Sequence, residues 1–222
     1  MIKVEEIRSQ FNNNVLFEQA LSHRSWLNEN EDTSSNERME FLGDAVLELC
    51  VSDALYHKLP DKPEGFLTAL RANIVNTKNL SQLAIKLEIG TALKLSKGED
   101  AGGGRTNSSL LADTIEAIIG ATYLDRGYEA ANQFIQDNLL SDLDQKLKEP
   151  LKDAKSLLQE KVQAMGMLAP KYKVVNEVGP DQSKIFTVDV HFGDYTSTGT
   201  GKSKSEAEQE AANAALAATT LK

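Results

Sequence analysis

The spacing of apolar residues changes once along the chain, and this change limits the folds that the sequence can adopt. From Met1 to about Asp144, apolar residues recur every three or four positions, which is typical of amphipathic helices. Residues 171–178 and 184–193 instead alternate apolar and polar side chains with period two, which predicts strands. The sequence therefore predicts an all-α part followed by a smaller part that contains a sheet.

The second part has the element order of a small α+β domain. A helix is predicted at residues 154–166, a third strand at 195–201, and a final alanine-rich helix from Ser203 to about Ala218. A polar stretch with Pro150 precedes these elements and is typical of a linker. The predicted division is an all-α domain at 1–144, a linker at 145–152 and an α-β-β-β-α domain at 153–222.

Turn-forming residues separate the helical runs of the first part. They predict breaks at residues 28–36 and 60–65, and a mobile surface loop at 98–107, which holds four glycines. Residues 67–87 are predicted to form one helical run. The run at 109–124 is apolar or small almost throughout, which predicts a helix buried on all sides.

A ridge of like charges lies on the helix predicted around residues 37–48. Four acids share one side of this helix at intervals of three, four and four residues: Glu37, Glu40, Asp44 and Glu48. The opposite side of the helix is predicted to carry Leu42, Ala45, Val46 and Leu49. Carboxylates at such spacings repel one another by roughly a few tenths of a kcal/mol. Either the ridge faces water, or a positive group offsets its charge.

A second pair of acids lies in the apolar run at 109–124. Asp113 and Glu116 are its only charged residues and, three positions apart, they share a face. Ala117 and Gly120 lie beside them and would let another helix approach closely. Burying two unpaired carboxylates costs roughly several kcal/mol each. A counter-charge is therefore required, and the run itself contains no lysine or arginine.

The two acidic helices together predict a metal site. If their acidic faces meet, Glu40, Asp44, Asp113 and Glu116 converge. Four carboxylates without histidine or cysteine form an oxygen site that suits Mg²⁺ or Mn²⁺ rather than zinc or copper. The three histidines are predicted to lie outside this group: His23, His57 and His191. For the first helix taken alone, a solvated acidic face is the alternative.

The net charge of −9 argues by itself against a nucleic-acid partner. However, residues 151–222 contain nine lysines and nine acids, so the whole excess belongs to residues 1–150. Cys50 is the single cysteine, which excludes an intrachain disulfide. No apolar run approaches the roughly 20 residues that span a bilayer, and the N-terminus lacks the apolar core of a secretory signal. A cytoplasmic protein without a membrane partner is expected.

The acidic segments resemble the motifs of bacterial ribonuclease III. ERMEFLGDAVL at 37–47 is similar to that family's signature helix, with Met39 where leucine is usual, and LLADTIEAIIGATYLD at 110–125 matches its second acidic motif. FEQALSHRSW and EGFLTALRANIVN are also similar to family segments. The tail resembles the family's double-stranded-RNA-binding domain in DAKSLLQEKVQ, PKYKVV, GPDQSKIFTVDV and GTGKSKSEAEQEAANAAL. The resemblance covers almost the whole chain.

The resemblance implies a homodimeric endonuclease that hydrolyses double-stranded RNA with Mg²⁺, for which Mn²⁺ would substitute. It implies 5′-phosphate and 3′-hydroxyl products, and a role in processing ribosomal RNA precursors, messenger RNA and other structured RNAs. By motif, Glu40, Asp113 and Glu116 would bind the metal. Asp44 and Glu116 would be the catalytic carboxylates.

Three further residues of the first part have roles that only the resemblance implies. Glu37 and Glu64 match family acids near the RNA-cutting face and would be auxiliary. Phe41 lies at the edge of the acidic arc, where a monomer gains nothing by exposing it. The corresponding family residue packs into the partner subunit.

In the tail, the resemblance implies RNA contacts at eight positions: Ser156, Gln159, Glu160, Gly179, Pro180, Gln182, Lys202 and Lys204. The first three would meet one minor groove, the loop around Gly179 the next, and the two lysines phosphate. Two departures from the family pattern predict weaker RNA binding. Gln182 stands where histidine is usual, and Ser205 replaces the second member of a basic pair.

Two other functions fit parts of the sequence. One is a non-catalytic protein that binds double-stranded RNA, which the four intact carboxylates disfavour. The other is a metal-dependent nuclease for another nucleic acid, which the tail disfavours.

Overall fold

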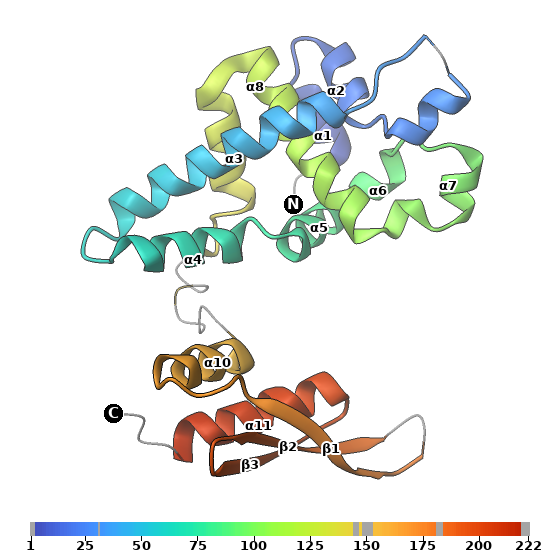
Figure 1. The fold of residues 1–222 in the computed structure, drawn as a ribbon. Helices are drawn as coiled ribbons and strands as arrows, with labels where there is room; N and C mark the ends of the chain where they lie inside the picture. The colour runs from blue at the N-terminus through green and yellow to red at the C-terminus, as the bar shows by residue number, and fades with distance from the viewer. Residues whose placement is uncertain (1–2, 31, 144–146, 148–152, 181–183, 219–222) are drawn as a thin grey trace. The chain divides into compact units, whose positions relative to one another are not determined.

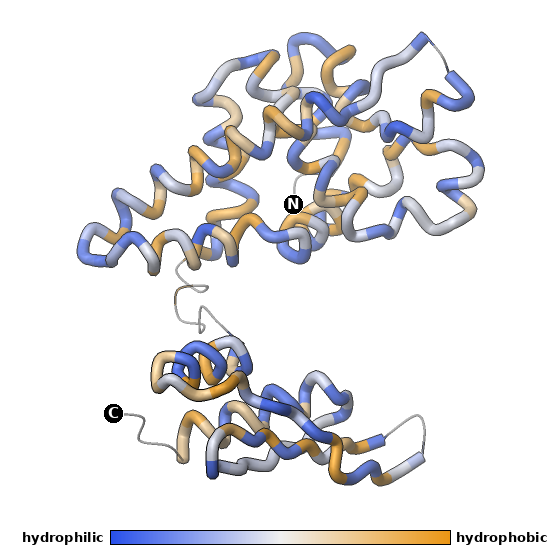
Figure 2. The backbone as a smooth tube through the Cα atoms, in the orientation of Figure 1, coloured by the Kyte–Doolittle hydropathy of each residue, from blue (hydrophilic) through white to orange (hydrophobic). Residues whose placement is uncertain are grey.

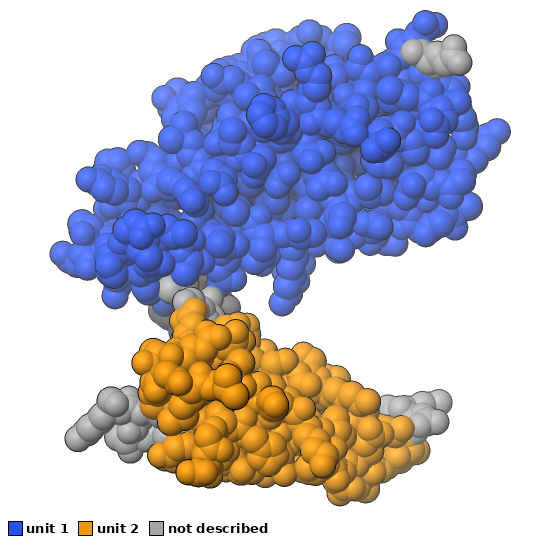
Figure 3. Space-filling view, viewed as in Figure 1, with its two compact units in different colours: residues 1–149 blue, residues 150–222 orange. Residues whose placement is uncertain are grey.

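The computed structural model describes the chain except residues 1–2, 31, 144–146, 148–152, 181–183 and 219–222. The chain divides into two compact units, residues 1–149 and 150–222 (Figure 3). The predicted linker, residues 145–152, lies outside the described residues except for Leu147, so its bounds stay a prediction. Among the described residues, no helix combines the length and the apolar character that crossing a membrane requires.

The first unit is helical, as predicted (Figure 1). Its elements in chain order are α1 (Val4–Ser9), α2 (Asn14–Ala20), the 3-10 helix η1 (Arg24–Asn28), α3 (Glu37–Lys58), α4 (Glu64–Ile74), α5 (Thr77–Lys86), α6 (Ile89–Ala92), α7 (Lys97–Ala101), the 3-10 helix η2 (Gly104–Thr106) and α8 (Ser108–Asn138). Along α3, hydrophilic and hydrophobic residues alternate with the helical turn (Figure 2). Inside α8, Gly127 has a non-helical backbone with φ 80°, so the helix is kinked there.

Helices α3 and α8 pack against each other across the first unit (Figure 1). Two glycines make this crossing close. A Cβ at Gly43 would lie 1.7 Å from the carbonyl oxygen of Glu116, and a Cβ at Gly120 would lie 2.2 Å from that of Met39. The predicted close approach at Gly120 is confirmed, whereas the role of Gly43 as its counterpart on α3 was not predicted.

The buried side of α3 is only partly the side opposite the acids. It consists of Met39, Gly43, Val46, Leu47, Cys50, Val51 and Leu55. Of the four apolar residues opposite the acids, only Val46 is buried. Leu42 is half-buried, Ala45 is exposed and Leu49 is 58% exposed. The crossing at Gly43 decides which arc of α3 faces α8, and hydrophobic spacing alone does not locate that crossing.

Two further predictions about the first unit were wrong. Residues 67–87 form two helices rather than one, because the Asn76 side chain accepts a hydrogen bond from the Asn79 N–H and begins α5 there. Residues 98–107 are not an irregular loop, because they contribute to α7 and η2. There Arg105 donates to both carboxylate oxygens of Asp100 and to the carbonyls of Gly90, Thr91 and Leu93.

The second unit has the predicted α-β-β-β-α order. Strands β1 (Lys171–Val178), β2 (Ile185–Phe192) and β3 (Tyr195–Gly201) form an antiparallel sheet in the order β1-β2-β3. Helices α10 (Ala154–Ala164) and α11 (Lys204–Ala218) complete the unit. Its core joins apolar residues of both helices to those of β2: Ala154, Leu158, Val162, Val188, Val190, Phe192, Ala207, Ala211, Ala212 and Ala215.

Small residues bring α11 close to β3. A Cβ at Gly199 would lie 2.0 Å from the backbone nitrogen of Ala211, and a Cβ at Gly201 would lie 2.6 Å from that of Ala207. The alanine-rich composition of α11 thus has a packing reason, since larger side chains would hold the helix away from the strand.

Candidate metal centre and RNA-binding surface

Three carboxylates converge where α3 and α8 cross. Glu40 comes from α3, and Asp113 and Glu116 come from α8. One oxygen from each lies within 4.8 Å of the others, and all three residues are half-buried. Glu40 stands one turn before Gly43, and Glu116 stands one turn before Gly120. The close contact at the two glycines therefore brings the carboxylates together, as the sequence predicted.

Of the three carboxyl groups, Glu116 has the largest rise in pKa. Burial, and then the negative charges of Asp44, Asp113 and Glu40, raise its pKa to about 7, from an ordinary value of 4.5. A metal-free chain therefore holds a proton on Glu116 over part of the neutral range. The carboxylates are close enough that they cannot all ionise freely without a cation.

The pKa values of Glu40 and Asp113 are also raised, with burial as the main cause in each. For Glu40, the nearby Asp113, Glu37 and Asp44 add to the effect. For Asp113, the neighbouring His23 opposes it and lowers the pKa. The sequence placed His23 outside the acidic group, and it offers no oxygen there, but it does act on Asp113.

The orientation of His23 follows from a local hydrogen bond. Its Nδ1 accepts from the N–H of Ser25 at 3.2 Å. In the neutral ring, Nε2 must then carry the proton. The effect of His23 on the pKa of Asp113 cannot be predicted from residue spacing, because His23 lies between α2 and η1, far from Asp113 along the chain.

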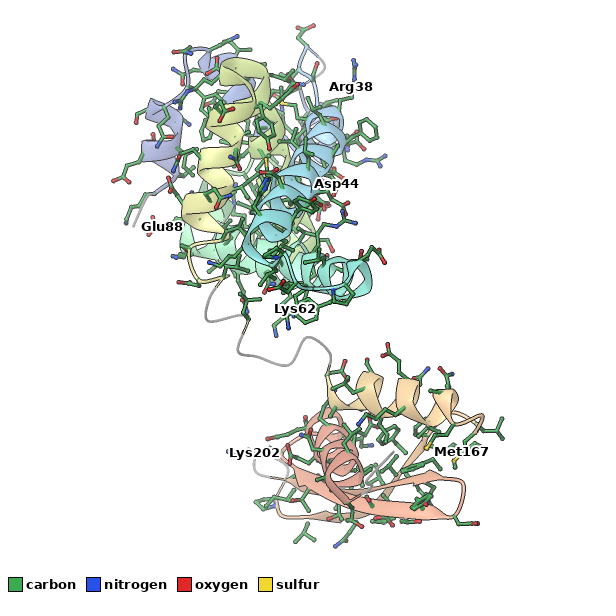
Figure 4. All side chains as sticks on the ribbon, turned by 90° about the vertical axis from the view of Figure 1, so that its left-hand side faces the viewer. Arg38, Asp44, Lys62, Glu88, Met167 and Lys202 are labelled. Atoms are coloured by element: carbon green, nitrogen blue, oxygen red, sulfur yellow. The ribbon has the colours of Figure 1, made fainter. Side chains whose placement is uncertain are left out.

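The other predicted acids lie around the group rather than in it. Asp44, labelled on α3 in Figure 4, is exposed and contributes its charge from the rim. Glu37 is exposed, accepts a hydrogen bond from Ser35 and lies 3.6 Å from Arg24. Glu64 begins α4, where it accepts a hydrogen bond from Thr68. The structure does not bring Glu64 into the three-oxygen group.

The donor set fits a hard divalent cation. Within the described part of the chain, no lysine or arginine forms an ion pair with Glu40, Asp113 or Glu116. Among the described residues, the three carboxyl groups with raised pKa values thus have only the influence of His23 on Asp113 to offset their charge. Oxygen ligands are those that Mg²⁺ prefers. The group could therefore bind a metal ion.

The predicted RNA-contacting residues of α10 lie on one exposed side of the helix. Ser156, Gln159 and Glu160 are all exposed, at spacings that place them together. The Ser156 hydroxyl donates to Asp153 Oδ2 at 2.8 Å, and Asp153 caps the helix. In the β1–β2 loop, Gly179 has φ 104° and Pro180 is exposed, while Gln182 lies outside the described residues.

The start of α11 exposes Lys202 and Lys204. The Ser203 hydroxyl accepts from the N–H of Glu206, and the Glu206 carboxylate accepts from the N–H of Lys202 at 2.7 Å. Glu206 therefore closes the helix end, in a variant of the capping box, besides adding negative charge beside the lysines.

Comparison with known proteins identifies both units. Residues 13–143 match a family model described as Ribonuclease-III-like, and residues 154–218 match the Double-stranded RNA binding motif. The Ribonuclease 3 of Natranaerobius thermophilus is 44% identical over 195 residues, which cover 87% of this chain and 85% of that protein. The chain belongs to the ribonuclease III family. Members of this family with this second domain are endonucleases of double-stranded RNA, and this chain is such an enzyme.

Two further relatives agree with this assignment. The Ribonuclease 3 of Borreliella afzelii is 43% identical over 220 residues, which cover 97% of this chain and 89% of that protein. The solved nuclease domain of ribonuclease III from Campylobacter jejuni has a TM-score of 0.56 and 37% sequence identity. It covers 62% of this chain and 99% of its own. The resemblance seen in the sequence is therefore confirmed.

In this ribonuclease III, α3 also presents an apolar surface to solvent. Phe41, Ala45, Leu49 and Tyr56 follow one another at intervals of four, four and seven residues, and we call them the α3 stripe. Phe41 is 81% exposed and Tyr56 is 69% exposed. Leu49 and Tyr56 also line a groove of about 560 Å³ between α3 and α4. Large apolar side chains exposed together on one side of a helix are typical of an interface.

Proposed function

We propose that the chain is a homodimeric, metal-dependent endoribonuclease that hydrolyses double-stranded RNA and leaves 5′-phosphate and 3′-hydroxyl ends. The observation that carries this proposal is the group of three carboxylate oxygens at the α3–α8 crossing. It occurs in a chain whose second unit is a double-stranded-RNA-binding motif. Mg²⁺ is the proposed cation, and Mn²⁺ would substitute for it.

In this proposal Glu40, Asp113 and Glu116 hold the cation. A bound divalent cation neutralises charge at phosphorus and lowers the pKa of water. Asp44 and Glu116 would be the catalytic carboxylates, as the family resemblance of the two acidic segments implies. Asp44 is exposed, and its charge is close enough to raise the pKa of Glu116. Glu37, one turn before Glu40, and Glu64 on α4 would have auxiliary roles.

The second unit would supply much of the affinity for RNA. Such domains span about 16 base pairs and contact two minor grooves and the phosphates between them. Ser156, Gln159 and Glu160 would meet one minor groove, and the Gly179–Pro180 turn with Gln182 the next. Lys202 and Lys204 would contact phosphate near the positive end of the α11 dipole. We further propose a cytoplasmic enzyme that processes ribosomal RNA precursors, messenger RNA and other structured RNAs.

One experiment tests the reaction class. The chain is incubated with a long RNA duplex, a DNA duplex and single-stranded RNA, each with Mg²⁺ and with EDTA. We expect cleavage of the RNA duplex alone, only with Mg²⁺, and products with 5′-phosphates. Equal cleavage of DNA, or cleavage in EDTA, would overturn the proposal.

The raised pKa of Glu116 predicts that pH affects the stability of the metal-free chain. The unfolded group ionises near 4.5 and the folded group near 7. The folded state therefore binds the proton more tightly, and the stability present below about pH 4.5 is lost as pH rises toward about 7. In EDTA, Tm should fall between pH 5 and pH 8 through this group. Mg²⁺ should raise Tm at pH 8 and have little effect at pH 5, since it binds ionised carboxylates.

The matched variant for this measurement is Glu116→Gln. It has no titrating group at this position, so it should lose much of the difference between pH 5 and pH 8. An unchanged pH profile in the variant would show that other groups cause the effect.

We propose that the α3 stripe is the dimer interface. The solved Campylobacter jejuni nuclease domain has a region that is involved in dimer formation, which supports a dimer in this family. Burial of one large apolar side chain contributes about 1.5–3 kcal/mol. Phe41→Ala should therefore weaken dimer association by at least about tenfold.

Sedimentation or light scattering over a range of concentrations measures this effect. Val15→Ala is the control, because Val15 is 71% exposed on α2 and lies outside the stripe. A wild-type chain that stays monomeric, or equal dimer affinity for both variants, would contradict the assignment.

A further inference from the structure

Glu177 on β1 lies between two lysines of the second unit. Its Oε1 is 3.8 Å from the ammonium of Lys204, and its Oε2 is 3.6 Å from the ammonium of Lys184. Glu177 is also the cross-strand partner of Phe186, and the Lys204 ammonium lies over the Phe186 ring, 5.8 Å from its centroid. One carboxylate thus faces positive groups from Lys184, the residue before β2, and from the start of α11.

We propose that Glu177 limits the affinity of the second unit for RNA, because its carboxylate competes with a backbone phosphate for Lys204 and Lys184. This inference rests on the proposed contact between Lys204 and phosphate. It assigns to Glu177 a role in setting how tightly the enzyme binds its substrate, separate from the chemistry of cleavage.

The geometry makes the competition direct. A phosphate oxygen that contacts the Lys204 ammonium would come close to the Glu177 carboxylate, since both anions use the same cation. Strand β1 pairs with β2 at this position, which fixes the backbone of Glu177 and keeps its side chain beside Lys204. Lys204 keeps 61% of its side chain exposed, so a phosphate can still reach it. Binding must then displace the carboxylate or accept its repulsion.

The effect belongs to binding rather than to folding. The Glu177 side chain is 38% exposed, and ion pairs this close to solvent add little to stability. A lysine whose charge is partly offset by a carboxylate neutralises less phosphate charge, so fewer of the counterions that surround the RNA are released at that contact. Such a lysine therefore contributes less to the salt dependence of RNA binding than a free lysine would.

Glu177→Gln tests the inference, since it removes the charge and keeps the shape. The full chain is titrated with a short RNA duplex in EDTA, so that nothing is cut, at several salt concentrations. We expect the Kd to fall about 2- to 5-fold for each second unit engaged, the range typical of exposed ion pairs. The slope of log affinity against log salt should steepen by up to about one unit for each.

Asp194→Asn is the matched control, because it makes the same change of charge at the turn between β2 and β3, away from the start of α11. If the two variants tighten binding equally, net charge alone explains the effect and the inference is wrong. It is also wrong if Glu177→Gln weakens binding, because Glu177 would then hold the lysines in place for RNA.

Variants of the two lysines distinguish a failure of this inference from a failure of the proposed contact between Lys204 and phosphate. If Lys204→Gln leaves affinity unchanged, the proposed phosphate contact fails. If Lys204→Gln weakens binding but Glu177→Gln does not tighten it, only the competition fails. When Lys204→Gln and Lys184→Gln are combined, Glu177→Gln should no longer tighten binding beyond the Asp194→Asn control, and a persisting gain would overturn the inference.

Discussion

Glu116→Gln should reduce the rate of RNA-duplex cleavage by about 10²–10⁴-fold, the range for loss of a positioned proton acceptor. Duplex binding in EDTA should stay within about twofold of the wild type, because the second unit is untouched. The amide has the shape of the carboxylate, so the α3–α8 crossing should persist. What it loses is the negative charge, which would help to hold the cation and would accept a proton.

The chain offers a close control for this substitution. Glu48 is the fourth acid of the ridge on α3, but it lies 3.5 Å from Arg71 and outside the three-oxygen group. Glu48→Gln therefore removes the same charge from the same surface, and its cleavage rate and the increase of Tm with Mg²⁺ should resemble those of the wild type. Both should be lost in Glu116→Gln. Cleavage by Glu116→Gln within a few-fold of the wild type would refute the site assignment.

The convergence of the carboxylates could be predicted because it depends on local rules. A spacing of three residues puts Asp113 and Glu116 on one face of any helix, and their apolar surroundings imply that this face is covered. The acids on α3 supply a matching face. Spacing alone could not separate Asp44 from the other three acids, and only the family resemblance left it out of the metal ligands. In the structure Asp44 is exposed and lies outside the three-oxygen group.

Other features depend on contacts between distant segments, which periodicity does not specify. Apart from Phe41, which the family resemblance assigned to a partner subunit, the residues of the α3 stripe cannot be told from core residues in the sequence. An apolar side chain has the same spacing whether its partner is α8 or another molecule. Likewise, the glycines at 98–107 suggest a loop, but Arg105 binds the carbonyls of Gly90, Thr91 and Leu93 and orders the segment. These carbonyls lie 12 to 15 residues from Arg105 along the chain, so no local sequence pattern predicts the contacts.

Gly43→Ala should be the most disruptive small substitution in the first unit. The added Cβ would lie 1.7 Å from the Glu116 carbonyl oxygen and 2.6 Å from its carbonyl carbon. These are backbone atoms of α8, so no side-chain rotation relieves the clash, and the helices must separate. Overpacking of this kind costs about 1–3 kcal/mol or more. For a chain of this size, that corresponds to a fall in Tm of roughly 2–12 °C.

The same separation would move Glu40 away from Asp113 and Glu116, so Gly43→Ala should lose the Mg²⁺-dependent rise in Tm and most of the cleavage. Gly65→Ala on α4 is the control, because a Cβ there meets nothing within 4 Å. Alanine also favours a helix over glycine by about 0.5–1 kcal/mol, so Gly65→Ala should leave Tm unchanged or raise it. The two variants make the same chemical change on helices of one unit, and they differ only in what lies next to the added carbon. A Gly43→Ala protein with wild-type Tm and wild-type response to Mg²⁺ would mean that the crossing does not set the geometry of the carboxylates.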